Sequence, residues 1–351
     1  MTKRKKYREG SIRTTSFDVA ALAGVSQSAV SRAFKPGASI APETRDKILD
    51  AARKLNYVPN SIASSLTTHR SNIVALILGD LHNPFYTHVL EAFGREMQDR
   101  DRQLLVFTVN EDLATDDAIM RLLRYQIDGV ILTSAQLSTQ MVGMCHNRGI
   151  PVVLFNRYIP QSGAFGVRCD NSWGGRQIAE AFLRAGAKTF GMITGDPNGT
   201  TSKDRVSGFV ERLIENGVPR TAIRSFEGNS TYEGACDAVR RMHADADGLP
   251  DAIFGINDTM AMGAMDTLRH HLGLSVPGDV MIAGFDDIPE GARLPYQLTT
   301  VRQPIKRMVR ATIEHLNLDN PGQPIDLTHD QPIRGHMVWR KTVPGDAPPE
   351  V

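Results

Sequence analysis

The chain has 351 residues, a length that suggests two or three folding units. Of these residues, 41% are hydrophobic and 23% charged, a composition typical of a globular protein. Its three cysteines, Cys145, Cys169 and Cys236, lie far apart, so the sequence supports neither a disulfide framework nor a zinc site. No apolar run approaches the length of a membrane span, and the basic N-terminus lacks the apolar core of a signal peptide. We therefore expect a cytoplasmic protein that uses no metal, no cofactor and no membrane.

Charge is distributed unevenly along the chain. Residues 1–70 carry 13 Lys and Arg against 5 Asp and Glu, a net charge of +8, whereas the whole chain has a net charge of only +1. A basic segment joined to a neutral or acidic body indicates a module that binds a polyanion. For residues 3–8 alone, a solvated basic tail is an equally good interpretation.

Three short helices are predicted between residues 14 and 59, after a polar tail over residues 1–13. Thr15 or Ser16 is suited to cap the first helix, and a glycine provides the turn after it. The second helix starts near Ser26, and the third opens at Pro42, a residue favoured in the first turn. A helix, a glycine-containing turn and a second helix predict a helix-turn-helix DNA-binding domain.

The second helix displays polar side chains opposite its apolar face. Gln27, Ser28, Ser31 and Arg32 are residue types that hydrogen-bond base edges and phosphates in the major groove. The alternatives are that the three helices form an interaction module and that Ser26 is only an N-cap. The net charge of +8 on the same segment favours DNA binding.

A linker over residues 60–71 follows this domain. Its apolar stretch SIASSL is too short to be a stable helix alone in water, so we expect it to become helical only against a partner. Residues 345–351 form a proline-containing tail at the other end of the chain.

From Ile73 onward, apolar strands alternate with amphipathic helices, which predicts parallel sheets covered by helices on both faces. The stretch is too long for one core, so we expect a body over residues 72–344 made of two α/β lobes with a cleft between them. We assign residues 72–169 and 301–324 to the first lobe, and residues 170–300 and 325–344 to the second. The predicted strands cover residues 73–78, 104–109, 129–133, 151–155, 165–169, 189–194, 222–226, 251–256 and 279–284.

Polar residues stand where several of these strands end, which is where ligands bind in parallel α/β folds. Asp, Asn and Arg around a cleft suit a small polar ligand such as a sugar, through paired hydrogen bonds. Helix capping is the competing interpretation, and we weigh it equally for Asp170, Asn171 and Asp258.

Several ordered motifs resemble the LacI/GalR family of bacterial transcription regulators over nearly the whole chain after residue 13. The resemblance implies a helix-turn-helix domain and a hinge helix, followed by a two-lobed body like that of periplasmic binding proteins. The motifs are DVAALAGVSQSAVSRAF, PETRDKILDAARKLNYVPNSIASSL, NPFY, DGVIL, GIPVVLFNR, CDN, NDTMAMG, VPGDVMIAGFDD and LTTVRQP.

The resemblance implies that bases are read by Gln27, Ser28 and Arg32, with Ser26, Ser31 and Asn60 also at the DNA. It places Leu66 in a hinge helix that folds on DNA, where this leucine wedges into the minor groove and kinks the operator. Without the resemblance, Leu66 is better interpreted as a buried leucine. For Arg32, a contact to phosphate alone is the open alternative to reading guanine.

The resemblance also implies a set of effector contacts in the cleft. We expect them to be Asn83, Phe85, Tyr86, Arg157, Arg205, Asn257 and Asp286. Arg205 could otherwise be an ordinary surface arginine. Where many sugar-responsive members carry an aromatic residue, this chain has Gly228-Asn229-Ser230, and Tyr232 or Phe165 are the possible replacements. Two arginines in one cleft would also suit an acidic sugar.

The sequence thus predicts a transcription regulator, most simply a repressor, whose small-molecule effector controls binding to double-stranded operator DNA. One subunit makes too few base contacts, so we expect a homodimer on an approximate palindrome. The rival interpretations are an enzyme, for which no catalytic motif or catalytic residue is found, and a solute-binding transport protein. A transport protein would carry an export signal and would lack the basic DNA-binding domain at the N-terminus.

Overall fold

The computed structural model describes two units, over residues 1–71 and 72–351, each of which is considered by itself. The described residues within them are 14–35, 37–59, 70–79, 81–109, 115–133, 137–159, 163–197, 199–318 and 331–345. Among these residues, no helix is long and apolar enough to cross a membrane.

The N-terminal unit contains the three predicted helices, α1 (Ser16–Ala23), α2 (Gln27–Ala33) and α3 (Pro42–Lys54). Thr15 caps α1 in a reciprocal capping box with Asp18, and Gly24 takes up the left-handed conformation that ends the helix. The helices pack around a small core of Val19, Ala20, Ala29, Val30, Ala33, Ile48, Ala51 and Ala52. The described part of the unit therefore consists of three packed helices, of which the second buries only one face.

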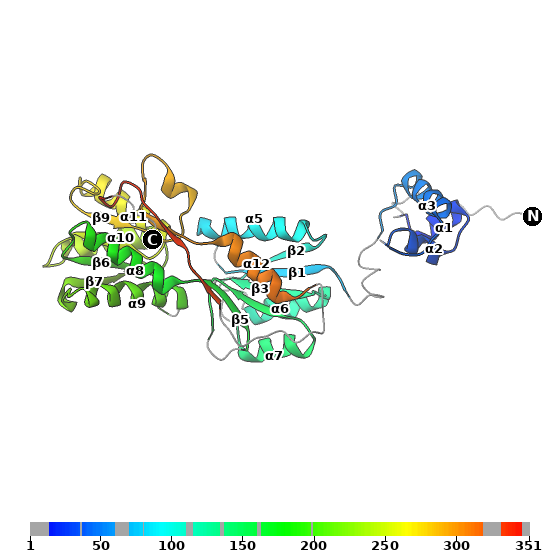
Figure 1. The fold of residues 1–351 in the computed structure, drawn as a ribbon, viewed down its shortest axis with the longest axis horizontal. Coiled ribbons are helices and arrows are strands. Elements are labelled where there is room, and N and C mark those ends of the chain that lie inside the picture. The colour runs from blue at the N-terminus through cyan, green and yellow to red at the C-terminus, as the bar shows by residue number, and fades with distance from the viewer. Residues whose placement is uncertain are drawn as a thin grey trace, which may run out of the picture. The chain divides into compact units, whose positions relative to one another are not determined.

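The C-terminal unit, which we call the body, is built on two parallel sheets (Figure 1). The first sheet has the strand order β11-β5-β4-β3-β1-β2, and the second has the order β7-β6-β8-β9. The nine predicted strands are confirmed with shifts of one or two residues at their ends. They are β1 (Ile73–Leu78), β2 (Gln103–Thr108), β3 (Gly129–Thr133), β4 (Val152–Phe155), β5 (Phe165–Cys169), β6 (Phe190–Thr194), β7 (Ile223–Glu227), β8 (Ala252–Gly255) and β9 (Met281–Ala283).

Helices alternate with these strands, as parallel connections require. In Figure 1, α5 and α12 lie on one side of the first sheet, and α6 and α7 on the other. The body helices are α5 (Pro84–Gln98), α6 (Thr115–Leu122), α7 (Thr139–Asn147), α8 (Asn171–Arg184), α9 (Thr200–Glu215), α10 (Tyr232–Ala244), α11 (Asp258–Asp266) and α12 (Ile305–Leu316).

The chain crosses between the two lobes three times, and two of these crossings involve strands that the sequence did not predict. The strands β10 (Thr300–Arg302) and β12 (His336–Val338) pair antiparallel, while β11 (Gln331–Ile333) joins the first sheet beside β5. Residues 331–333 therefore do not belong to the second lobe, where we expected them. The red C-terminal segment in Figure 1 follows this last crossing.

Helices α8 and α9 approach each other closely at two glycines. A Cβ on Gly175 would lie 2.2 Å from the backbone oxygen of Arg205, and a Cβ on Gly208 would lie 2.1 Å from that of Ser172. Only glycine permits this spacing. The contact fixes α9, and with it Arg205, against the start of α8.

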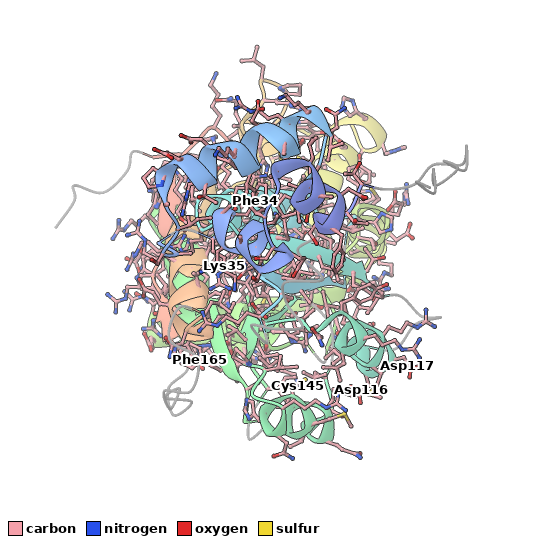
Figure 2. All side chains as sticks on the ribbon, turned by 90° about the vertical axis from the view of Figure 1, so that its right-hand side faces the viewer. Phe34, Lys35, Asp116, Asp117, Cys145 and Phe165 are labelled. Carbon is pink, nitrogen blue, oxygen red and sulfur yellow. The ribbon has the colours of Figure 1, made fainter. Side chains whose placement is uncertain are left out.

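Figure 2 shows Asp116 and Cys145 in the same part of the first lobe. Asp116, at the start of α6, accepts hydrogen bonds from the backbone and the hydroxyl of Ser138, the N-cap residue of α7. These bonds tie two neighbouring helices together, and the burial of Cys145 between them raises the pKa of its thiol. The hydrogen bonds of Asp116 and the burial of Cys145 therefore stabilise the packing of α6 and α7, and they need no ligand to account for them.

Candidate DNA-reading surface and ligand cleft

Helix α2 presents one polar face to solvent. Ala29, Val30 and Ala33 are buried in the small core, whereas Gln27, Ser28, Ser31 and Arg32 are all exposed on the helix surface. Figure 2 shows Phe34 and Lys35 directly after the helix. The placement of these four side chains is what a recognition helix needs, because a base-reading group must reach away from its own domain.

Two serines at the start of α2 have local roles as well. The Ser26 hydroxyl accepts a hydrogen bond from the backbone N–H of Ala29, so this residue is an N-cap, and it lies 3.0 Å from the hydroxyl of Ser28. The Gln27 amide donates to the Ser16 hydroxyl at 3.3 Å. These contacts orient Gln27 and Ser28 before any DNA is bound.

Phe17 is a candidate that the sequence argument missed. It lies on α1 with 71% of its side chain exposed, although it is large and apolar. Apolar side chains next to a recognition helix can contact the methyl group of thymine. The signal in the sequence was weak, because Phe17 stands next to the buried stripe of α1 and an inward direction was equally plausible.

The charge of the N-terminal segment is concentrated outside the helical domain. Residues 14–59 hold 6 Lys and Arg against 4 Asp and Glu, so most of the excess belongs to the tail over residues 1–13. That tail, Asn60 and Leu66 lie outside the described residues. The predicted roles of Asn60 and Leu66 in DNA binding stay predictions.

In the body, the seven expected effector contacts line one cavity of about 270 Å³ between the lobes. We call this cavity the cleft. The first lobe contributes the start of α5 and the end of β4, and the second lobe contributes α9 and the loops after β6, β7, β8 and β9. The residues that the sequence argument placed there are Asn83, Phe85, Tyr86, Arg157, Arg205, Asn257 and Asp286.

Arg205 is held rigidly at the floor of the cleft, with only 5% of the residue exposed. Its Nε donates to Asn171 at 2.9 Å, its Nη1 to the backbone oxygen of Ile256 at 2.6 Å, and its Nη2 to Asp286 at 3.2 Å. The guanidinium also lies 3.7 Å from the centre of the Phe285 ring. Arg205 is therefore not a surface arginine, and its direction is fixed before a ligand enters.

Asp286 is the acceptor at the centre of the same network. Besides Arg205, the amides of Gln303 and Asn83 donate to its carboxylate, at 2.7 and 3.4 Å. Burial raises the pKa of Asp286, and these three donors lower it. Its backbone φ of 126° is one that residues with a side chain rarely adopt, and such strain clusters at functional sites.

Helix capping and a position in the lining of the cleft coexist in two asparagines. Asn83 accepts from the backbone N–H of Phe85 as the N-cap of α5, and Asn257 accepts from Met260 as the N-cap of α11. In each case the capping oxygen is occupied and the amide NH₂ group faces other partners. The two interpretations therefore do not compete at these positions.

Asp170, Asn171 and Asp258, for which capping and ligand contact were weighed equally, all form hydrogen bonds within the protein. Asp170 caps α8 by accepting from Trp173, and Asn171 accepts from Arg205. Asp258 is fully buried, accepts from the Thr300 hydroxyl at 2.5 Å and accepts from the backbone of Ile288 at 2.8 Å. None of the three lines the cleft.

Neither proposed replacement for the missing aromatic residue reaches the cleft. The Tyr232 hydroxyl donates to Asp266 at 2.7 Å, and Phe165 stacks on His315 in the first lobe. The aromatic side chains that do line the cleft are Phe85 and Tyr86, and Ser230 lines it where other members carry the aromatic residue. The expectation about Tyr232 and Phe165 was wrong because both side chains make their contacts within their own lobes.

Two further residues line the cleft: Asn156, which stands at the end of a predicted strand but was not among the expected effector contacts, and Asp196, which was missed. The side-chain oxygen of Asn156 is buried and accepts no hydrogen bond from the described residues, so it is available to a hydroxyl or amine of a ligand. Asp196 adds a carboxylate opposite Arg157, whose pKa is lowered by burial and raised by Tyr86 and Asp196. Among the described residues, the charged groups that line the cleft are thus two arginines and two aspartates.

Comparison with known proteins agrees with this architecture. Residues 17–60 match the family model of bacterial regulatory proteins of the lacI family, and residues 179–343 match a periplasmic binding protein-like domain. The ribose operon repressor of Halalkalibacterium halodurans is 30% identical over 333 residues, which cover 95% of this chain and 98% of that protein.

Two solved structures are also similar. The lac repressor dimer bound to operator and the anti-inducer ONPF has a TM-score of 0.83 at 24% identity, over 94% of this chain and 99% of that chain. The complex of the transcriptional regulator CelR with cellobiose has a TM-score of 0.66 at 26% identity, over 94% of this chain and all of that one. The helix-turn-helix, the two-lobed body and these similarities agree: the chain belongs to the lacI family of bacterial regulatory proteins and is a DNA-binding transcription regulator.

Proposed function

We propose that the protein is a repressor that binds an approximately palindromic operator as a homodimer, and that a small neutral polyhydroxylated ligand in the cleft controls this binding. The observation that carries the DNA-binding part is the exposed polar face of α2, opposite its buried alanines and valine. The dimer is supported by the need for two half-sites and by the similarity to the lac repressor dimer. The protein would act in the cytoplasm, on the DNA of the nucleoid.

The charge balance of the cleft supports a neutral ligand. Arg205 is already neutralised by Asp286, and Asp196 lies opposite Arg157. A carboxylate would therefore meet no uncompensated pair of arginines, which removes the main argument for an acidic sugar. The side-chain oxygen of Asn156, which has no partner among the described residues, can accept a hydrogen bond from a sugar hydroxyl.

Control follows from the position of the cleft. Because both lobes line it, a ligand that fits one relative arrangement of the lobes shifts the protein toward that arrangement. Regulation of about a hundredfold needs a difference of only about 3 kcal/mol in ligand affinity between the two states.

The DNA-binding part is tested by Arg32→Ala, with Arg53→Ala as a matched control on the exposed surface of α3. An operator is first identified by genomic footprinting. In gel-shift titrations at fixed salt, we expect Arg32→Ala to lose about ten- to a hundredfold of its preference for the operator over random duplex, because a base contact is lost. Binding to random duplex persists, and Arg53→Ala keeps the preference. Equal losses of Arg32→Ala on both duplexes would contradict base reading.

A further inference from the structure

A second cavity lies beside the cleft, on the other side of Asp286 and Phe85, which line both. It has a volume of about 600 Å³, within the range of pockets that hold small molecules. Its walls come from α5, from the loop after β9, from the junction of β10 with α12, and from the link between β11 and β12. The cavity therefore lies where the chain crosses between the lobes.

The wall formed by α12 is strongly cationic. Lys306 and Arg307 are exposed in the first turn of the helix, and Arg334 lines the opposite wall. The two acids that line the cavity are already paired, since Asp286 binds Arg205, and Asp287 binds Arg302 and Arg340. Among the described residues, the carboxylate that Arg334 faces is the distant one of Asp170, at 3.8 Å. The described surface of the cavity thus has an excess of positive charge.

The start of α12 adds to this excess. No described side chain caps the helix, whose N-cap residue is Pro304, and two cations stand in its first turn. Cations are unfavourable at the positive end of a helix, and an anion there is favourable. An anion bound at this end of α12 would offset both the missing side-chain cap and the repulsion of the two cations in the first turn.

Gln303 supplies an independent indication of a ligand. It is 3% exposed, and its amide nitrogen donates to Asp286 at 2.7 Å, which fixes the orientation of the side chain. Its oxygen Oε1 is buried and has no partner among the described residues. A buried acceptor without a hydrogen-bond partner destabilises the folded protein, and a donor from a bound molecule would remove this penalty. Since Gln303 lines the cavity, a hydroxyl of a bound molecule would satisfy it.

We propose that this second cavity binds a small phosphorylated polyol, whose phosphate lies against Lys306, Arg307 and the start of α12 and whose hydroxyl donates to Gln303. A phosphate fits better than a carboxylate because its three terminal oxygens can meet several cations together. The proposal does not depend on the ligand of the cleft.

One consequence does rest on the proposed function of the cleft. Because Asp286 and Phe85 belong to both cavities, occupancy of either cavity is expected to change the affinity of the other, by the same factor in both directions. The protein would then respond to two small molecules.

The test uses calorimetric titration of the full chain with inorganic phosphate, glycerol and glycerol 3-phosphate. We expect glycerol 3-phosphate to bind more tightly than phosphate, and glycerol alone to bind undetectably. The double variant Lys306→Gln/Arg307→Gln should weaken glycerol 3-phosphate by more than about tenfold, the effect of losing charged hydrogen bonds. Arg310→Gln, an equal charge change per site on the exposed face of α12 outside the cavity, should leave the affinity within about twofold.

Three results would overturn the proposal. They are the absence of glycerol 3-phosphate binding at millimolar concentrations, an equal loss per charge in Arg310→Gln, and a loss in the cleft variant Arg157→Gln without a loss in the double variant. The last result would place the molecule in the cleft. Operator binding measured on the same samples separates these outcomes from a failure of the proposed DNA-binding function.

Discussion

At the scale of single residues, Asp286 connects more of the body than any other side chain described above. It neutralises the buried Arg205 of the second lobe, accepts hydrogen bonds from the amides of Asn83 and Gln303, and lines both cavities. A buried ion pair is weak evidence for stability, but the removal of one partner leaves the other charge uncompensated.

We therefore predict that Asp286→Asn destabilises the body by about 3 kcal/mol or more and abolishes ligand binding in the cleft, because Arg205 loses its counter-charge and the ligand loses an acceptor. Thermal melting with and without ligand measures both effects. Asp196→Asn, which removes an exposed carboxylate of the same cleft, is the control and should melt close to the unaltered protein. If Asp286→Asn melts like this control, the buried pair is not structural.

Asp258 should make stability depend on pH. Burial, followed by the charge of Asp286, raises its pKa to about 7 from the ordinary value of 3.8. Folding therefore retains a proton that the unfolded chain releases, so stability decreases as pH rises from about 4 to about 7 and is level above. The slope is at most about 1.4 kcal/mol per pH unit.

Asp258→Asn removes this titration and keeps groups that can bond Thr300 and Ile288. We expect the difference in unfolding free energy between the unaltered protein and the variant to shrink across that pH range. A difference that stays constant from pH 4 to pH 8 would show that Asp258 ionises normally.

How much of each site could be predicted also depends on single residues. Strand-end polar residues and family motifs led to all seven expected residues of the cleft. Asn156 was recognised only as a polar residue at the end of a predicted strand, and Asp196 was missed because only the fold brings the loops after β4 and β6 together. The directions of Tyr232 and Phe165 could not be predicted, since an aromatic residue at the end of an element can face its own core or the cleft.

At the scale of elements, parallel strands were predictable because most of them are largely apolar runs between turn residues. The three-residue strands β10, β11 and β12 carry no such pattern, and their pairing depends on segments far away in the sequence. The same short strands form the crossings between the lobes, so the boundary near residues 331–333 was the part of the domain division that the sequence could not settle.

The packing of α8 on α9 gives a prediction at this scale. Gly208→Ala places a methyl group against the backbone of Ser172 and forces the helices apart, so we expect a loss of about 1–3 kcal/mol in stability and weaker ligand binding through displaced Arg205. Gly94→Ala, in the middle of α5 with nothing within 4 Å of the added methyl, should gain up to about 1 kcal/mol. Chemical denaturation of both variants measures the difference, and similar stabilities would contradict the close approach.

At the scale of the whole molecule, composition and charge asymmetry correctly indicated a small reader joined to a larger body. What the sequence could not supply was the balance of charge in the cleft, which appears only when Arg157, Arg205, Asp196 and Asp286 are brought to one cavity. Of the two ligand classes that the sequence left open, a sugar and an acidic sugar, that balance favours the neutral sugar.

Occupancy of the cleft is expected to control DNA binding by the helix-turn-helix domain, and one measurement tests this most directly. Operator affinity is titrated by fluorescence anisotropy at fixed salt, with and without a saturating neutral sugar found by thermal-shift screening, for the unaltered protein and for Asp286→Asn. We predict that the sugar changes the operator affinity of the unaltered protein by about tenfold or more and leaves that of the variant unchanged. An operator affinity of the unaltered protein that does not respond to a sugar bound in the cleft would contradict the account.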